Sequence, residues 1–121
     1  MNIIFGAAVD QVADTHTVLE LDTFKLIPSE KLVTSYCVID NLPLAEFPQL
    51  EANKKIHQQL MEQYRQQNWE FCRSALHTLT GCWNREMDTF YKHLKERIDE
   101  YIDNPPDTAW DGIIIKQQTP V

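Results

Sequence analysis

Residues 104–113 read Asn-Pro-Pro-Asp-Thr-Ala-Trp-Asp-Gly-Ile and mark the change from helical to extended patterning in this chain. Pro105 and Pro106 end any helix before them, because proline lacks the backbone N–H that a helix interior needs. The apolar run 113–115 predicts a short strand, and Asp111-Gly112 leads into it. Trp110 lies in an otherwise polar segment, so we expect its indole to pack back onto the preceding helices.

Three stretches upstream of the prolines repeat apolar side chains at helical spacing. The second stretch begins at Trp69 and ends at Thr80-Gly81, where glycine suits the left-handed position after a helix. Asn84 is a good N-cap for the third helix. The short breaks between the helices require antiparallel neighbours, in an arrangement similar to a tetratricopeptide unit. The apolar stripe comprises Ile56, Leu60, Tyr64, Trp69, Cys72, Leu76, Leu79, Met87, Phe90, Tyr91, Leu94, Ile98 and Tyr101.

The N-terminal part of the chain predicts a β-hairpin. Residues 17–27 and 32–39 are rich in β-branched and aromatic side chains, and Pro28 supplies turn chemistry between them. A short helix is expected before the hairpin, from Ala7 to Thr15. A lone hairpin is marginally stable in water, so it must pack on the helices or on another chain.

These patterns together predict an α+β fold, with an N-terminal β-hairpin, a three-helix tetratricopeptide-like antiparallel bundle and a short C-terminal strand. Residues 1–40 are the small β-hairpin region, residues 41–50 are a connector, and residues 51–121 are the helical domain with its C-terminal clasp. Three apolar side chains are expected to pin the connector to the surface: Leu42, Leu44 and Phe47.

Composition and charge exclude several classes of function. The 121 residues fit a single domain, with 43% hydrophobic and 10% aromatic residues. A formal net charge of −7 and basic residues scattered among acidic ones argue against nucleic-acid binding, which needs clustered Lys and Arg. No apolar run approaches the ~20 residues that span a bilayer, and the apolar start lacks the basic region of a signal peptide. We therefore expect a cytoplasmic protein that binds neither nucleic acid nor membrane.

The three cysteines cannot form a closed disulfide framework, because their number is odd. Cys72, His77 and Cys82 could be imagined as zinc ligands, but their spacing fits no common zinc pattern. Free buried thiols are frequent in reduced proteins. We expect no bound metal and no cofactor.

The sequence contains no set of residues that predicts catalysis, so we expect that the chain is not an enzyme. His57, His77 and His93 have polar neighbours and are expected to be solvated imidazoles rather than general acids or bases. Asp88 and Arg97 are expected to form an ion pair along the third helix, with recognition of an anion as the alternative. Three indoles are expected to be core or closing aromatics rather than platforms for ligand stacking: Trp69, Trp83 and Trp110.

The stretch 60–72, Leu-Met-Glu-Gln-Tyr-Arg-Gln-Gln-Asn-Trp-Glu-Phe-Cys, resembles the helix-turn-helix tail appended to many bacterial class III adenylate/guanylate cyclases. Tyr64-Arg65, Trp69 and Cys72 occupy the places that the family pattern gives to a Tyr-Arg pair, a Trp and a small residue. The resemblance continues to the end of the chain at Asp88, Glu96, Arg97, Pro105, Pro106, Trp110, Asp111, Gly112 and Ile113.

The hairpin region extends this resemblance, because residues 19–26 and 33–36 are similar to the last hairpin of the cyclase catalytic domain. The family's metal-binding aspartates, its purine-selecting pair and its transition-state Asn/Arg pair would lie on segments before residue 1. The resemblance therefore implies a cyclase tail without its catalytic part.

Two functions follow from these patterns. The first is a non-catalytic protein-interaction or assembly module, in which the helices offer an edge or groove and the β part joins a neighbour's sheet or self-associates. The alternative is a regulator in cyclic-nucleotide signalling that acts on a cyclase in trans or binds a nucleotide. The residues expected to carry the structure and the interaction are Tyr64, Trp69, Asp88, Arg97, Trp110, Asp111 and Gly112.

Overall fold

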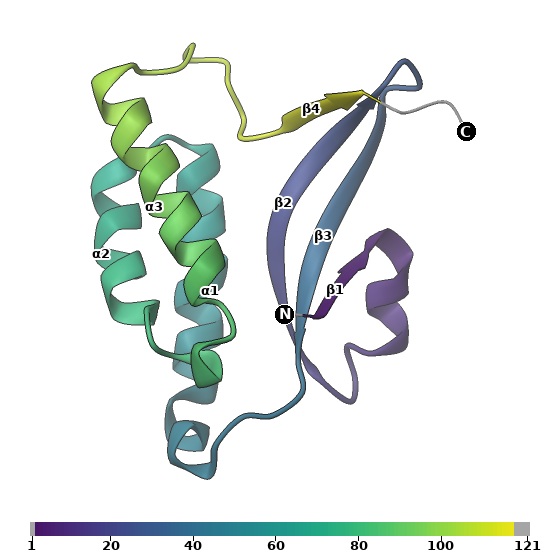
Figure 1. Ribbon diagram of the computed structural model, residues 1–121, viewed down its shortest axis with the longest axis vertical. Helices are drawn as coiled ribbons and strands as arrows, with labels where there is room; N and C mark the ends of the chain where they lie inside the picture. The colour runs from purple at the N-terminus through teal and green to yellow at the C-terminus, as the bar shows by residue number, and fades with distance from the viewer. Residues whose placement is uncertain (1, 118–121) are drawn as a thin grey trace.

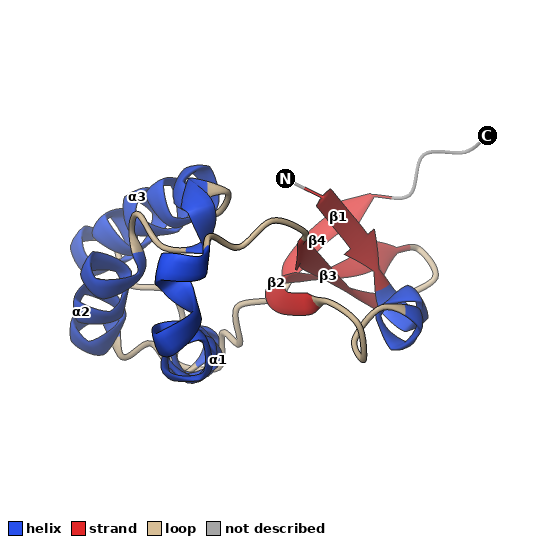
Figure 2. Ribbon diagram, turned by 90° about the horizontal axis from the view of Figure 1, so that it is seen from below, coloured by secondary structure: helices blue, strands red, loops and turns tan. Residues whose placement is uncertain are grey.

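The computed structural model describes residues 2–117, in which a layer of helices lies on one side of a four-stranded sheet (Figures 1 and 2). The α+β class predicted from the sequence is confirmed. The chain begins in the sheet, passes through the helices and returns to the sheet in its last strand (Figure 1).

The sheet has the strand order β1-β3-β2-β4. β2 (Thr17–Ile27) and β3 (Lys31–Ile39) form a long antiparallel hairpin. β1 (Asn2–Phe5) pairs antiparallel with β3, and β4 (Ile114–Gln117) pairs parallel with β2. The two outer strands, β1 and β4, therefore come from the two ends of the described chain.

The stretch between β1 and β2 differs in detail from the sequence-based expectation. The structure places the 3-10 helix η1 (Gly6–Gln11) where a short helix from Ala7 to Thr15 was expected. The sequence patterns do not predict β1 at all, because a four-residue strand carries too little alternation to be recognised.

The helices occupy the three stretches with apolar periodicity. They are α1 (Leu50–Arg65), α2 (Trp69–Leu79) and α3 (Asp88–Asp103). α2 has a side-chain N-cap, because Asn68 Oδ1 accepts a hydrogen bond of 3.4 Å from the backbone N–H of Phe71. Within residues 2–117, no helix combines the length and the apolar character needed to cross a bilayer.

Asn84 does not cap α3, so that sequence-based expectation is wrong. Asn84 lies in the short 3-10 helix η3 (Trp83–Arg85) with a φ of +52°, and α3 begins later, at Asp88. The indole of Trp83 is buried, and the carboxylate of Glu46 accepts hydrogen bonds from the backbone N–H groups of Trp83 and Asn84. These contacts hold the turn in a conformation that Asn84 alone would not specify.

The connector contains the 3-10 helix η2 (Leu44–Gln49), and its contact with the rest of the molecule differs from the prediction. Leu42 packs against the core, but the side chains of Leu44 and Phe47 are 78% and 52% exposed. The expectation that all three apolar side chains pin the connector is therefore wrong. The polar side chain of Glu46 makes the connection instead, through its hydrogen bonds to the loop between α2 and α3.

One hydrophobic core joins the sheet to the helices. Leu19 and Leu21 of β2 and Cys37 of β3 belong to the same buried cluster as the helical stripe. The hairpin is thus stabilised by packing, as a hairpin in water requires. The predicted division of the chain at residues 40 and 50 stays a prediction. The helical members of the cluster are Leu60, Met61, Tyr64, Cys72, Ala75, Leu76, Leu79, Phe90, Tyr91, Leu94 and Ile98.

Candidate functional site

An aromatic cluster joins the C-terminal segment to the helices, and we define it as Tyr64, Trp69, Tyr101 and Trp110. The Trp110 ring lies 5.3 Å from the ring of Tyr64 and 5.0 Å from that of Tyr101, measured between centroids. Trp69 stacks on Tyr101 at 5.5 Å. Each pair lies within the range in which aromatic rings attract one another beyond simple burial. The indole of Trp110 therefore packs onto α1, α2 and α3, as we expect from the sequence.

Gly112 makes a close approach possible between the C-terminal segment and α1. Its φ is +81°, and a Cβ placed there would lie 3.1 Å from Cγ of Arg65 and 3.4 Å from Cε1 of Tyr64. Glycine is thus required both for the backbone conformation and for the space. The preceding residue supports the turn, because Oδ1 of Asp111 accepts a hydrogen bond of 3.2 Å from the backbone N–H of Ile113.

Arg97 pairs with Asp22 of β2, and not with Asp88. Its Nη1 and Nη2 atoms donate to Oδ1 and Oδ2 of Asp22, both at 3.0 Å. Although burial opposes the charged form, the hydrogen bonds to Asp22 raise the pKa of Arg97 above its ordinary value. The predicted pair with Asp88 is wrong because the two residues lie on opposite faces of α3, about two and a half turns apart.

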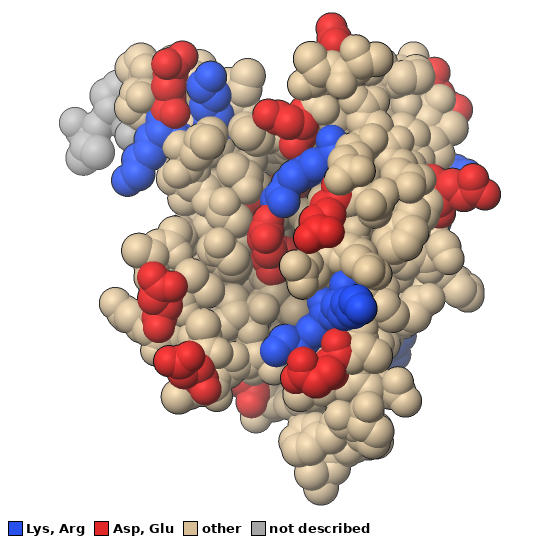
Figure 3. Space-filling view, turned by 180° about the vertical axis from the view of Figure 1, so that it is seen from behind, with Lys and Arg blue, Asp and Glu red and all other residues tan. Residues whose placement is uncertain are grey.

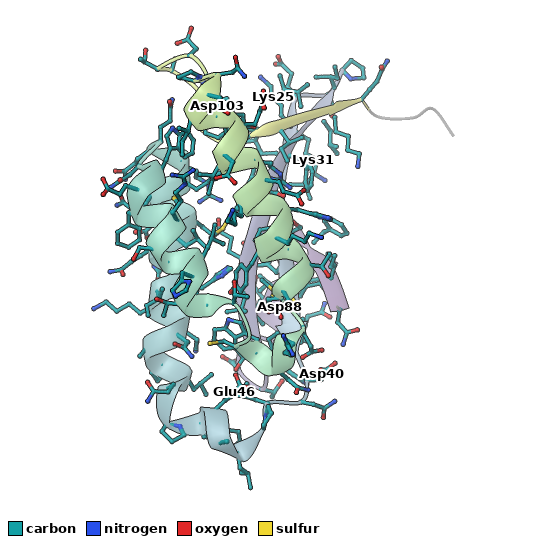
Figure 4. The ribbon with its side chains drawn as sticks, turned by 60° about the vertical axis from the view of Figure 1, so that its left-hand side comes forward. Lys25, Lys31, Asp40, Glu46, Asp88 and Asp103 are labelled. Carbon is teal, nitrogen blue, oxygen red and sulfur yellow. The ribbon has the colours of Figure 1, made fainter. Side chains whose placement is uncertain are left out.

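Asp88 has a different task at the other end of α3. Its Oδ1 accepts a hydrogen bond of 2.8 Å from the backbone N–H of Gly81, and its Oδ2 lies 3.3 Å from Nε of Arg85. Figure 4 shows Asp88 and Glu46 at the same end of the molecule, near the loop between α2 and α3. Asp88 thus orders that loop and does not join the other predicted residues.

His57 is buried, so the expectation of a solvated imidazole is wrong at this position. Its Nε2 lies 2.6 Å from the backbone oxygen of Glu20, and its Nδ1 lies 3.0 Å from the hydroxyl of Tyr91. The oxygen of Glu20 can only accept, so Nε2 carries the proton and Nδ1 accepts from Tyr91. The hydroxyl of Tyr91 in turn accepts from the indole N–H of Trp83 at 3.0 Å.

This chain of hydrogen bonds favours the neutral imidazole. Burial lowers the pKa of His57 below its ordinary value of 6.5. The chain connects β2, α1, α3 and the η3 turn, so its polar groups serve to hold the fold together. A second polar link joins the same strand to α1, where Arg65 forms an ion pair with the side chain of Glu20.

The described residues hold no cluster of three or more His, Cys, Asp or Glu side chains that could bind a metal ion. All three cysteines are free, with Cys37 and Cys72 buried and Cys82 half-buried. Burial raises the pKa of the Cys37 thiol to about 11 and that of the Cys72 thiol to about 12. Such thiols are poor nucleophiles near neutral pH.

Acidic and basic side chains alternate on the face of the molecule seen in Figure 3, where blue and red groups lie beside one another. That face has no continuous area of one sign. The electrostatic footprint of a protein that binds nucleic acid is a basic stripe, and this face does not carry one.

The sheet ends in an apolar edge at β1, which the sequence patterns do not predict. Ile3 and Phe5 are 46% and 55% exposed, and they border an apolar pocket of about 160 Å³. Phe24 of β2 and Phe90 of α3 form other walls of this pocket. The signal available in the sequence is the uncharged run 2–5 directly before Gly6.

The structure thus brings together five of the residues predicted to carry structure or interaction. Tyr64, Trp69 and Trp110 share the aromatic cluster, and Asp111-Gly112 forms the turn beside it. Arg97 takes part in a separate ion pair with the sheet, and Asp88 lies at the far end of α3.

Comparison with known proteins identifies no relative of this chain. No family model matches it, and no curated protein or solved structure is significantly similar to it. The resemblance to the tails of class III cyclases therefore stays a prediction.

Proposed function

We propose that this chain is a non-catalytic protein-interaction and assembly module, and that its β1 edge pairs with β1 of a second copy. The observation that carries the proposal is the uncharged, half-exposed edge formed by Asn2–Phe5. Within residues 2–117, β1 pairs with β3 alone, so its other side offers unpaired backbone donors and acceptors. Such edges pair readily with a further strand.

The charge of the two sheet edges favours β1 over β4. β4 carries Lys116, whose ammonium lies 5.5 Å from the ring centre of Phe24. A lysine on an edge strand is a common means of preventing unwanted pairing. β1 has no charged side chain, so pairing of two copies through this strand brings no like-charged side chains of the strand together.

Antiparallel pairing of β1 with itself gives a closed two-fold dimer, because the same residues face one another on both sides. Ile3 and Phe5 lie opposite Cys37 and Ser35 of β3, so they share the face of the sheet that the helices cover. Side chains of the second copy would thus lie beside the apolar pocket next to Phe90, whose volume is about 160 Å³. That volume is close to the ~150 Å³ of a cavity that admits a benzene ring.

Several polar groups that could do chemistry are already engaged in structural contacts, which supports a non-catalytic role. His57 is held neutral between Glu20 and Tyr91, and Arg97 is held by Asp22. We further propose that the three helices form a tetratricopeptide-like antiparallel bundle whose task is to support the sheet. The resemblance to a cyclase tail supports this arrangement, in which Trp69 and Trp110 close the bundle.

The experiment is sedimentation velocity of the whole chain over a wide range of concentrations, with two matched variants. Phe5→Lys changes a 55% exposed side chain on β1, and Leu44→Lys changes a 78% exposed side chain on η2. Both variants reduce the net negative charge equally, so general repulsion falls equally in both. We expect a reversible dimer in the native chain and in Leu44→Lys, and self-association at least about tenfold weaker in Phe5→Lys.

Two results would contradict the proposal. A native chain that stays monomeric at the highest concentration has no β1 dimer. Equal dimerisation of Phe5→Lys and Leu44→Lys would place the contact elsewhere on the surface.

The regulator of cyclic-nucleotide signalling is the alternative function, and it rests on the cyclase-tail resemblance. Thermal-shift measurements with ATP, GTP and cyclic nucleotides test its nucleotide-binding form. A ligand at 100 times its dissociation constant stabilises the folded chain by about 2.7 kcal/mol. An unchanged melting temperature with every nucleotide would contradict this form of the alternative.

A further inference from the structure

A groove of about 660 Å³ runs between α2 and α3, away from the β1 edge. Leu76 and Tyr91 contribute its apolar lining, and both side chains are buried against the core. Arg73 and His77 border it from α2, while Lys92 and Lys95 border it from α3. The groove thus lies between basic walls, in a chain whose net charge is −7, and its apolar floor is almost closed to solvent, since Leu76 and Tyr91 are 3% and 1% exposed.

The molecule already places one carboxylate between these walls. Oδ1 of Asp99 lies 2.9 Å from Nη2 of Arg73, and Oδ2 of Asp99 lies 3.0 Å from Nζ of Lys95. Asp99 therefore links the middle of α2 to the later part of α3. Its hydrogen bonds to Arg73 and then to Lys95 lower the pKa of Asp99.

One turn away on each helix lies a second pair of basic side chains, His77 and Lys92, and no carboxylate of the described residues bridges them as Asp99 bridges Arg73 and Lys95. His77 follows Arg73 by one turn of α2, and Lys92 precedes Lys95 by one turn of α3. Among the described residues, neither His77 nor Lys92 lies within 4.0 Å of an acidic oxygen in an ion pair.

Asp88 also lines the groove, but both of its oxygens are engaged. Oδ1 accepts from the backbone N–H of Gly81, and Oδ2 pairs with Arg85. Asp88, the acidic residue in this lining, is thus committed to the loop between α2 and α3.

We propose that this groove binds an acidic segment of a partner protein, with a partner carboxylate between His77 and Lys92 and an apolar side chain against the aliphatic part of Lys92. The complementarity of charge selects this occupant. An acidic segment is repelled by most of this chain's surface, but Lys92 borders this groove without a carboxylate partner among the described residues, whereas Arg73 and Lys95 are already paired with Asp99. The site is separate from the β1 edge, so either contact can exist without the other.

The test is fluorescence anisotropy with a synthetic probe and the whole chain. The probe is a fluorescein-labelled amphipathic peptide in which Leu recurs at helical spacing and Glu fills the positions between. Two matched peptides carry Gln in place of every Glu, or Gln in place of every Leu. We expect saturable binding of the first peptide, and binding at least about tenfold weaker for each of the other two.

Variants of the chain locate the contact. Lys92→Gln removes one exposed lysine from the groove, and Lys55→Gln removes an exposed lysine from α1, so both change the net charge equally. We expect Lys92→Gln to weaken peptide binding about three- to tenfold, as loss of one hydrogen bond of typical strength does, and Lys55→Gln to leave binding unchanged. Both positions are exposed, so circular dichroism should show an unchanged fold.

Three results would overturn the inference. They are no binding of the Glu/Leu peptide, equal binding by the Lys92→Gln and Lys55→Gln variants, or displacement of the peptide by ATP as effectively as by unlabelled peptide. The last result would mean that the groove responds to phosphate charge alone. The oligomeric state measured in the same samples reports on the β1 edge independently.

Discussion

The guanidinium of Arg97 on α3 donates two hydrogen bonds of 3.0 Å each to the carboxylate of Asp22 on β2. The Asp22 side chain is 9% exposed and that of Arg97 is 31% exposed, so the pair is largely withdrawn from water. This two-point contact fixes how the helical layer is oriented on the sheet, because a bidentate arginine pair allows one relative orientation of its partners.

Replacing Asp22 by Ala leaves the guanidinium of Arg97 without its carboxylate. We expect the free energy of unfolding to fall by roughly 2–4 kcal/mol, since breaking a buried pair leaves an uncompensated charge. Urea unfolding followed by circular dichroism measures the change. Asp99→Ala is the control, because it removes only exposed ion pairs, those with Arg73 and Lys95, whose contribution to stability is small. Equal effects of the two substitutions would contradict this account of Arg97.

The buried imidazole predicts a specific dependence of stability on pH. Burial lowers the pKa of His57 in the folded chain below 6.5, so the unfolded chain binds more protons just below that pH. The contribution of this group is therefore fully present above about pH 7 and is lost as the pH falls below 6.5. Urea unfolding at several pH values between about 5 and 7 measures the slope, which reaches at most ~1.4 kcal/mol per pH unit for one group.

Substitution separates His57 from the exposed histidines. We expect His57→Gln to lower the free energy of unfolding at neutral pH. The same substitution removes the part of the pH dependence of stability that is due to the imidazole of His57. His77→Gln is the matched control, because it replaces a histidine on the surface of α2 and leaves the hydrogen bonds of His57 in place. A slope that survives in His57→Gln would mean that another group titrates in this range.

Because Gly112 lies close to α1, we expect a side chain at this position to destabilise the fold by steric overlap. Gly81 serves as the control that separates this overlap from the backbone cost of replacing a glycine with a positive φ. Gly112 and Gly81 have similar φ values of +81° and +91°, but a Cβ at Gly81 would meet no atom within 4 Å. Alanine at Gly81 therefore carries only the backbone cost, of order 1 kcal/mol. We expect Gly112→Ala to cost about 1–2 kcal/mol more, because Arg65 and Tyr64 must move. Equal melting temperatures of the two variants would show that the C-terminal segment is not held closely against α1.

The thiols should differ in reactivity according to their burial. Cys37 and Cys72 are buried and their pKa values are raised to about 11 and about 12, whereas Cys82 is half-buried. We expect an aromatic disulfide reagent at pH 8 to modify Cys82 first, while the other two react only after unfolding in guanidinium. Peptide mass mapping of the modified chain identifies the site. Rapid modification of Cys72 would contradict its place in the core.

The helices could be predicted from the sequence because their signal is local. The apolar positions from Ile56 to Tyr101 recur with the helical period. α2 begins at Trp69, as expected, and ends at Leu79, directly before the expected stop at Thr80-Gly81. The packing of Trp110 onto the helices could also be predicted, because a large indole in an otherwise polar segment is expected to be buried. Such features depend on residues that are close in sequence or unusually large.

The polar contacts could not be predicted, because their partners are far apart in sequence. Asp22 and Arg97 are 75 residues apart, and His57 lies 37 residues from Glu20. The sequence around Arg97 or His57 contains no pattern from which the distant hydrogen-bond partner could be predicted. β1 was missed for a related reason, since its pairing with β3 matches Ile3 to Cys37 across the whole first third of the chain.

Amide hydrogen exchange along β1, measured at low and high protein concentration, tests the central claim most directly. If copies pair through this strand, the backbone amides of residues 2–5 become more protected as the concentration rises, while those of β4 (Ile114–Gln117) keep their exchange rates. Exchange along β1 that is independent of concentration, or protection that rises at β4 instead, would contradict the proposed assembly.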